Sequence, residues 1–218
     1  LAVKSRLAEQ AYREAATKLT AARHKAAKLL ASAVCTAMAD LGMTGGAFEV
    51  RLATSAEPRA AGTDEIEYLI SPNPGQAPMP LSKIASGGEL SRMSLAIQVI
   101  AIDGSTIPTM IFDEVDSGVG GGVAEMVGRH LRDLGRTRQV LCVTHLAQVA
   151  GLADNHFRVV KITDGLSTRI AINQLNDAER IEELARMLGG MKITKKTREH
   201  AAEMLSNSRC PEKTSKAG

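Results

Sequence analysis

The sequence is poor in aromatic residues. Tryptophan is absent from its 218 residues, and only two tyrosines and three phenylalanines are present. Because proteins that bind single-stranded nucleic acid by base stacking need aromatic platforms, this scarcity argues against that class. The three cysteines, Cys35, Cys142 and Cys210, lie far apart and are odd in number. A disulfide framework and a cysteine-based zinc site are therefore not expected, and a reducing cytoplasm fits the composition.

The sequence also lacks a long apolar run, so it predicts no membrane span and no membrane partner. The phosphate-binding pattern G-x-x-x-x-G-K-[ST] is likewise absent. The chain starts with Leu-Ala-Val-Lys, which resembles neither a signal peptide nor a start at methionine, and we expect a piece of a longer protein. What is present is a globular composition, with 44% hydrophobic and 23% charged residues.

Residues 3–41 form one long helical pattern without glycine or proline. Its apolar and small residues step by three and four positions in a heptad seam: Tyr12, Ala15, Leu19, Ala22, Ala26, Leu29 and Ala33. A coiled-coil arm and a plain amphipathic helix both explain this seam. Because the chain offers the seam no partner, we expect the helix to be loosely held or swapped. Residues 1–46 carry seven Lys or Arg against three acidic residues, which favours a solvated basic face over a phosphate-binding one.

The remaining segments alternate between strand and helix patterns. Strands are predicted at 48–52, 66–70, 109–112, 139–144, 156–163 and 167–174. Helices are predicted at 89–102, 122–134, 176–189 and 194–207. We expect loops at 55–64 and 72–80, and a hairpin turn at Asp164-Gly165. The strands at 109–112 and 139–144 should be buried and parallel, joined by a crossover helix, so the predicted fold class is α/β.

Three motifs carry side chains suited to phosphate chemistry. The first is Ser86-Gly87-Gly88-Glu89, which precedes the apolar helix. Its glycines let the backbone approach an anion closely, and the helix N-terminus directs free N–H groups toward that anion. A plain helix cap and turn explains the same four residues, so this motif is weak by itself.

The second motif is Asp113-Glu114, which directly follows the strand at 109–112. Ligands of α/β sheets bind at this edge. Because adjacent residues of an extended chain point in opposite directions, the two carboxylates should have different roles. One can hold Mg²⁺, directly or through water, and the other can orient and deprotonate an attacking water. A solvated acidic turn is the alternative.

The third motif is His145, which follows the strand pattern at 139–144. At that edge of the sheet it can reach a phosphate oxygen, and it can equally cap the next helix. The other histidines show no metal-ligand spacing.

With these motifs the chain resembles the ABC-type ATPase superfamily. Ser86–Glu89 resembles its signature motif, Ile111–Glu114 its Walker B strand, Asp116 its D-loop acid and His145 its switch histidine. Three longer stretches narrow the resemblance to bacterial SMC-like DNA repair ATPases: Lys83–Arg92, Phe112–Gly121 and Thr144–Ala150.

The resemblance implies an α/β C-terminal lobe of an ABC-type ATPase head that carries a coiled-coil stub. The implied domains are the stub at 1–46, the lobe at 47–208 and a disordered tail at 209–218. The absent Walker A loop would belong to the N-terminal half of the same head, so this chain alone should not hydrolyse ATP. The implied partners are that half, a second head in a homodimer and double-stranded DNA, in the cytoplasm at the nucleoid.

The resemblance also implies a role for each site residue, with ATP as substrate and Mg²⁺ as cofactor. Glu114 would be the general base for the attacking water, and His145 would sense the γ-phosphate. Nucleotide binding would fall to Ser86, Gly87, Gly88, Glu89, Asp113 and Asp116. Among these, Asp113 would hold Mg²⁺ through water, and Asp116 would link the two sites of the dimer.

Two other functions fit part of the pattern. The ATPase subunit of an ABC transporter would share the motifs, but the heptad before the signature and the sequence Gly118-Val119-Gly120-Gly121 after Asp116 count against it. A structural coiled-coil tether without hydrolysis is the other alternative. The presence of Asp113, Glu114 and His145 counts against the tether.

Overall fold

The computed structural model describes residues 1–84, 86–100, 107–163, 167–189 and 192–209. Its contacts group the chain into two compact units, Leu1–Gly104 and Ser105–Gly218, each of which is described by itself below. Of the helices in the described residues, none combines the length and the apolar character needed to cross a membrane. The predicted hairpin turn at Asp164-Gly165 lies outside the described residues, as does the predicted disordered tail at 209–218 except for its first residue, Arg209, which ends a helix.

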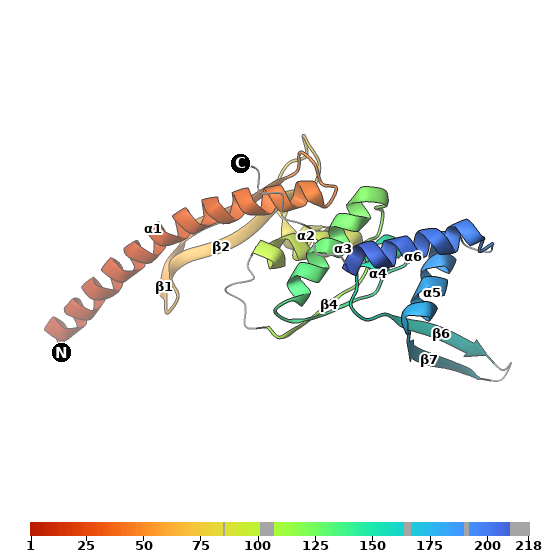
Figure 1. The fold of residues 1–218 in the computed structure, drawn as a ribbon. Coiled ribbons are helices and arrows are strands. Elements are labelled where there is room, and N and C mark those ends of the chain that lie inside the picture. Colours follow the sequence, from red (N-terminus) through yellow and green to blue (C-terminus); the bar gives the residue numbers. More distant parts are fainter. Residues whose placement is uncertain (85, 101–106, 164–166, 190–191, 210–218) are drawn as a thin grey trace, which may run out of the picture. The chain divides into compact units, whose positions relative to one another are not determined.

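The first unit is built on one long helix, α1 (Ala2–Asp40), as the sequence predicts (Figure 1). Its buried side chains are Ala16, Val34, Ala37 and Met38, and the helix packs along the strands β1 (Ala47–Arg59) and β2 (Gly62–Ser71). The contact grouping therefore joins α1 to the segments that follow it, whereas the sequence predicts a boundary at residue 46.

The buried face of α1 is not the predicted seam. Most seam residues are exposed: Ala15, Leu19, Ala22, Ala26 and Leu29. The residues of α1 that pack on the hairpin are shifted by about one position toward the C-terminus from the seam residues, because the hairpin presents polar partners to those positions. Asp64 accepts hydrogen bonds from the Thr20 hydroxyl (2.7 Å) and from Arg23 (2.8 Å). The hydrogen bond from Arg23, followed by that from Thr20, lowers the pKa of the Asp64 carboxyl.

The hairpin pairs the two predicted strands in register, with Phe48 opposite Ile70 and Leu52 opposite Ile66. Its strands extend far beyond the predicted ends, so the loop expected at 55–64 is wrong for most of its length. The turn is short because Gly62 takes a φ of +94°, which side-chain-bearing residues rarely adopt. The tip is fastened to α1 by the Tyr12 hydroxyl, which donates to the Arg59 carbonyl (3.0 Å) and accepts from its N–H (3.1 Å).

The unit is completed by a two-residue strand β3 (Met79–Pro80), a short 3₁₀ turn (Leu81–Lys83) and the helix α2 (Gly87–Ile100). The proline-rich connector is therefore irregular up to β3, as predicted.

The second unit starts with the predicted crossover. Strands β4 (Thr109–Phe112) and β5 (Gln139–Cys142) are parallel, and α3 (Gly121–Gly135) connects them. The prediction that both strands are buried is wrong on one face. Met110 and Phe112 are buried, but Ile111 is 73% exposed, Leu141 45% and Val143 62%.

The rest of the unit consists of α4 (Ala147–Gly151), the hairpin of β6 (Phe157–Thr163) and β7 (Thr168–Gln174), and the helices α5 (Asp177–Gly189) and α6 (Lys195–Arg209). The predicted capping box is confirmed: Asn176 donates its N–H to Glu179 (2.8 Å), and Glu179 donates its N–H to the Asn176 side chain (3.0 Å). Small and branched apolar residues of α4, α5 and α6 form the core here: Ala147, Ala150, Leu184, Ala185, Ala201 and Leu205.

A buried carboxylate joins α5 to the β6–β7 hairpin. The side chain of Glu183 is 5% exposed and accepts hydrogen bonds from Arg186 through both oxygens, the shortest at 2.6 Å. A second arginine, Arg158 of β6, lies 3.7 Å from it. The hydrogen bonds from Arg186 are the main reason why the pKa of Glu183 is lowered.

We predict that Glu183→Gln destabilises the chain by about 1–3 kcal/mol at pH 7, because it leaves a buried charge network incomplete. Since the folded-state pKa is lowered, the carboxylate stabilises the fold above its ordinary value of 4.5, and this contribution is lost as the pH falls through the folded value. Urea titrations at pH 7 and at pH 3 measure both effects.

The matched control is Glu182→Gln, one residue earlier on the same helix. Glu182 pairs with Arg198 at 2.7 Å, but both side chains are about half exposed. Its replacement should change the free energy of unfolding by less than about 1 kcal/mol. Equal losses at the two positions would contradict the assignment to Glu183.

Candidate phosphate-chemistry site at the sheet edge

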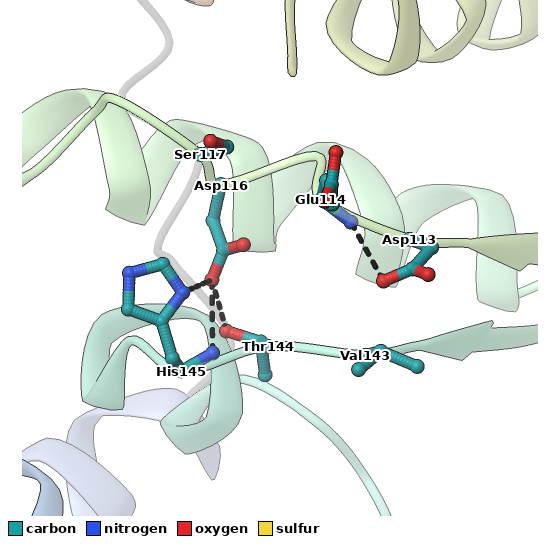
Figure 2. A pocket seen from close by; sticks show the side chains of 7 residues that line it. All are labelled: Asp113, Glu114, Asp116, Ser117, Val143, Thr144 and His145. Carbon is teal, nitrogen blue, oxygen red and sulfur yellow. Dashed lines mark hydrogen bonds and ion pairs between the residues drawn. The ribbon is translucent and has the colours of Figure 1, made fainter. Parts of the chain in front are cut away.

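Two chain segments leave the same edge of the parallel pair and together line an open pocket. Phe112 is opposite Cys142 in the register, and the Val143 N–H donates to the Phe112 carbonyl (2.9 Å). The segments after β4 and β5 therefore run side by side (Figure 2). The pocket has a volume of about 340 Å³ and is lined by Asp113, Glu114, Asp116, Ser117, Val143, Thr144 and His145.

The two carboxylates after β4 are held in different orientations. Asp113 accepts the N–H of Glu114 on its Oδ1 (2.9 Å), while Glu114 has a φ of +56°. A left-handed backbone is costly for a residue other than glycine, by about 1–3 kcal/mol, and such strain is concentrated at functional sites. Both side chains are exposed, and in Figure 2 their carboxylates point in different directions. The sequence argument predicts different directions from an extended chain, whereas the structure has a left-handed backbone at Glu114.

The third acid, Asp116, is almost completely buried, with 1% exposure. Its Oδ2 accepts a hydrogen bond from the Thr144 hydroxyl and another from the His145 N–H (3.2 Å). The carboxylate is thus directed at the segment after β5 of its own chain. Whether it also links two heads, as the resemblance implies, stays a prediction.

The imidazole of His145 is at the mouth of the pocket. Its side chain is 70% exposed, and its Nδ1 lies 3.6 Å from Asp116 Oδ2, within ion-pair range if the ring is protonated (Figure 2). An exposed imidazole at this position can contact an anion that enters the pocket.

The thiol nearest the pocket is not a candidate nucleophile. Burial, with smaller contributions from the charges of Asp116 and Asp113, raises the pKa of Cys142 to about 12. The residue therefore stays a neutral thiol at physiological pH, and nucleophilic chemistry needs the thiolate. The chemistry available to the pocket is that of carboxylates, hydroxyls and an imidazole.

The signature-like residues lie in the other compact unit, at the start of α2. The Ser86 hydroxyl accepts the Glu89 N–H (3.3 Å), which is a helix cap. Ser86 and Gly87 are exposed, Gly88 is buried and Glu89 is partly buried. The capping interpretation is therefore correct as local structure, and the exposed cap is still open to an anion.

Of the eight predicted site residues, the second unit brings four together in one pocket: Asp113, Glu114, Asp116 and His145. Sequence reasoning did not assign three pocket residues, Ser117, Val143 and Thr144, and of these Thr144 contacts Asp116. Its place directly before His145, at the end of a strand, was the available signal.

The pocket suits a weakly held hard cation. Among the residues that the structure describes, no group of three or more His, Cys, Asp or Glu side chains could enclose a metal. Mg²⁺ commonly uses one or two carboxylates and takes its other ligands from water and substrate phosphates. The exposed Asp113 and Glu114 fit that donor set.

Comparison with known proteins finds several DNA repair proteins named RecN. The chain is 50% identical over 197 residues to the DNA repair protein RecN of Xylella fastidiosa. The matched region covers 89% of this chain and 35% of that protein. Identity is 48% with RecN of Haemophilus influenzae (87% and 34% covered) and 41% with RecN of Streptomyces coelicolor (89% and 36% covered). The chain thus spans about a third of the length of these relatives. No family model matches it.

Solved structures support the fold. The Smc head domain with a coiled coil and joint from Pyrococcus yayanosii matches with a TM-score of 0.52 and 21% identity, covering 71% of this chain and 28% of that one. The Smc head domain with an extended coiled coil from Pyrococcus furiosus matches with a TM-score of 0.50 and 20% identity (72% and 37% covered). The chain is therefore an α/β protein, as predicted, and it shares the fold of part of an Smc head domain.

Proposed function

Because this chain is a relative of the RecN DNA repair proteins along nine-tenths of its length, we propose that it is the C-terminal lobe of an SMC-like ATPase head that acts in DNA repair. The observation that carries the proposal is the convergence of Asp113, Glu114 and His145 at one sheet edge. The SMC-head fold supports it independently. The names of the relatives also favour repair over the transporter alternative.

We propose ATP hydrolysis as the reaction. Glu114 accepts the proton of the water that attacks the γ-phosphate, because its carboxylate is exposed in the pocket and points in a different direction from that of Asp113. His145 donates a hydrogen bond to a γ-phosphate oxygen from the other side of the pocket. A magnesium ion on Asp113 would neutralise part of the charge that develops on the phosphate oxygens.

The proposed site is shared between several parts. The sequence has no G-x-x-x-x-G-K-[ST] loop, so the phosphate cradle must come from another segment, which we propose is the N-terminal half of the same head. The exposed cap of α2, Ser86-Gly87-Gly88, would face the nucleotide of a second head in a homodimer. The chain by itself is then inactive.

The apolar face of the β4–β5 pair supports a missing lobe. Ile111 and Leu141 are exposed on the strands, and Val143 is exposed directly after β5, on a face that would be buried in a larger sheet. The chain spans only about a third of its relatives, so most of a RecN-length protein remains available to cover this face. We propose that the N-terminal half does so, and that α1 continues into a coiled-coil arm that transmits head engagement to double-stranded DNA at the nucleoid.

The test is ATP turnover with Mg²⁺, measured for this chain, for the N-terminal half of its parent protein, and for the two mixed, each with and without linear double-stranded DNA. We expect turnover in the mixture only. Turnover by this chain alone would contradict a shared site. A folded mixture that neither binds nor hydrolyses ATP would contradict the proposed function.

A further inference from the structure

The pocket contains one set of polar contacts that the proposed hydrolysis does not use. Asp116 is buried to within 1% of its surface, and a buried carboxylate is costly unless it is hydrogen-bonded. The structure gives its Oδ2 two donors, the Thr144 hydroxyl and the His145 N–H. Both donors belong to the segment that carries His145.

Thr144 extends this set of contacts by one residue. Its hydroxyl oxygen, which donates to Asp116, also accepts the N–H of Leu146 (3.0 Å), the residue that caps α4. The backbone around His145 is therefore fixed on both sides. The imidazole ring itself lies 3.6 Å from Asp116, beyond hydrogen-bond distance, so its position follows from the backbone that carries it.

Asp116 is also fixed on the side of Glu114. The Ser117 N–H donates to the Glu114 carbonyl (3.0 Å), and the Val119 N–H donates to the Asp116 carbonyl (3.4 Å). Asp116 therefore sits in the turn that leaves the strained Glu114, and its carboxylate reaches the turn that carries His145 (Figure 2).

We infer that Asp116 and Thr144 form a latch between the two turns and act as positioning residues that hold His145 in place relative to Glu114. This inference rests on the proposed function for its consequence in catalysis, but the latch itself is a property of this chain. It gives Asp116 a role inside one head, distinct from the link between heads that the resemblance implies.

The tests use the complete head, assembled from this chain and the rest of its parent protein. Thr144→Val keeps the side-chain shape and removes the hydroxyl, Thr144→Ser keeps the hydroxyl, and Asp116→Asn keeps the shape while removing the charge. Thr17→Val is the matched control, because the Thr17 hydroxyl donates to the Arg13 carbonyl of its own helix, α1.

The first readout is hydrogen–deuterium exchange of the peptide that contains His145 and Leu146, without nucleotide. We expect exchange at least about 10-fold faster in Thr144→Val and Asp116→Asn, and close to wild type in Thr144→Ser and Thr17→Val. Wild-type exchange in both latch variants would overturn the inference, whatever the ATPase activity is.

The second readout separates kcat from KM for ATP. Misplacing one catalytic group without removing it should lower kcat by about 10- to 100-fold and leave KM within a factor of about three. The double variant Asp116→Asn with Thr144→Val should be no slower than the slower single variant, since both break one unit. Multiplicative losses, or a lower kcat with unchanged exchange, would refute the latch.

A third outcome concerns the proposed function. If the wild-type head shows no ATP turnover but the latch variants still accelerate exchange at His145, the latch stands and the proposed hydrolysis fails. Should Thr144→Val not fold, Asp116→Asn decides between the same outcomes, because it preserves the side-chain volume at its site, and Thr144→Ser remains the variant that keeps the hydroxyl.

Discussion

Replacing Glu114 by glutamine in the complete head is expected to lower ATP turnover by about 100-fold or more while leaving ATP affinity within a few-fold. Glutamine keeps the size of the side chain but cannot accept a proton from the attacking water. The backbone at this position is already left-handed, and the substitution does not change the backbone cost. Steady-state turnover and equilibrium binding of ATP measure the two quantities separately.

Glu125→Gln is the matched control for this substitution. Glu125 is half exposed on α3 and pairs with Arg129 one turn along the same helix at 2.9 Å. Its replacement should leave turnover unchanged. If Glu114→Gln retained normal turnover, the general base would be another group, and the assignment of Glu114 would be wrong.

Placing a charge on the exposed face of the β4–β5 pair should prevent assembly with the N-terminal half. Ile111→Lys is expected to weaken that association by at least about 30-fold, because a charge would be buried at the centre of an apolar contact. Since Ile111 is 73% exposed in this chain, the stability of the chain alone should change by no more than about 1 kcal/mol. Calorimetric titration of the N-terminal half and thermal unfolding measure the two effects.

Ile66→Lys on β2 serves as the control, because Ile66 is also an exposed isoleucine of a strand, in the other unit. It should associate as wild type does. Normal association of Ile111→Lys would mean that another surface receives the N-terminal half.

The elements with strong local signals could be predicted from the sequence. The uninterrupted helical pattern predicts α1. Apolar residues at alternate positions, around Phe48 in one segment and Ile70 in the other, predict the two strands of the first hairpin. The capping box at Asn176 predicts the start of α5. Asp113, Glu114 and His145 could be expected at one edge because parallel strands that neighbour each other end on the same side.

What could not be predicted depends on contacts between distant segments. The packed face of α1 is fixed by Asp64, Thr20 and Arg23, which no heptad pattern reveals. The β1–β2 hairpin extends beyond its apolar residues because the backbone hydrogen bonds between the strands do not require apolar side chains. The exposure of Ile111 is invisible in a sequence whose apolar run is typical of a buried strand.

The attachment of α1 to its hairpin has a mechanical consequence. At 39 residues, the helix is about 58 Å long, so each degree of tilt at one end displaces the other by about 1 Å. The hydrogen bonds of Tyr12 and Arg23 attach the helix to the hairpin at two further points and oppose bending of the helix. A small rotation of the helix about its buried end, at Val34 and Met38, would therefore produce a larger displacement of its N-terminal end.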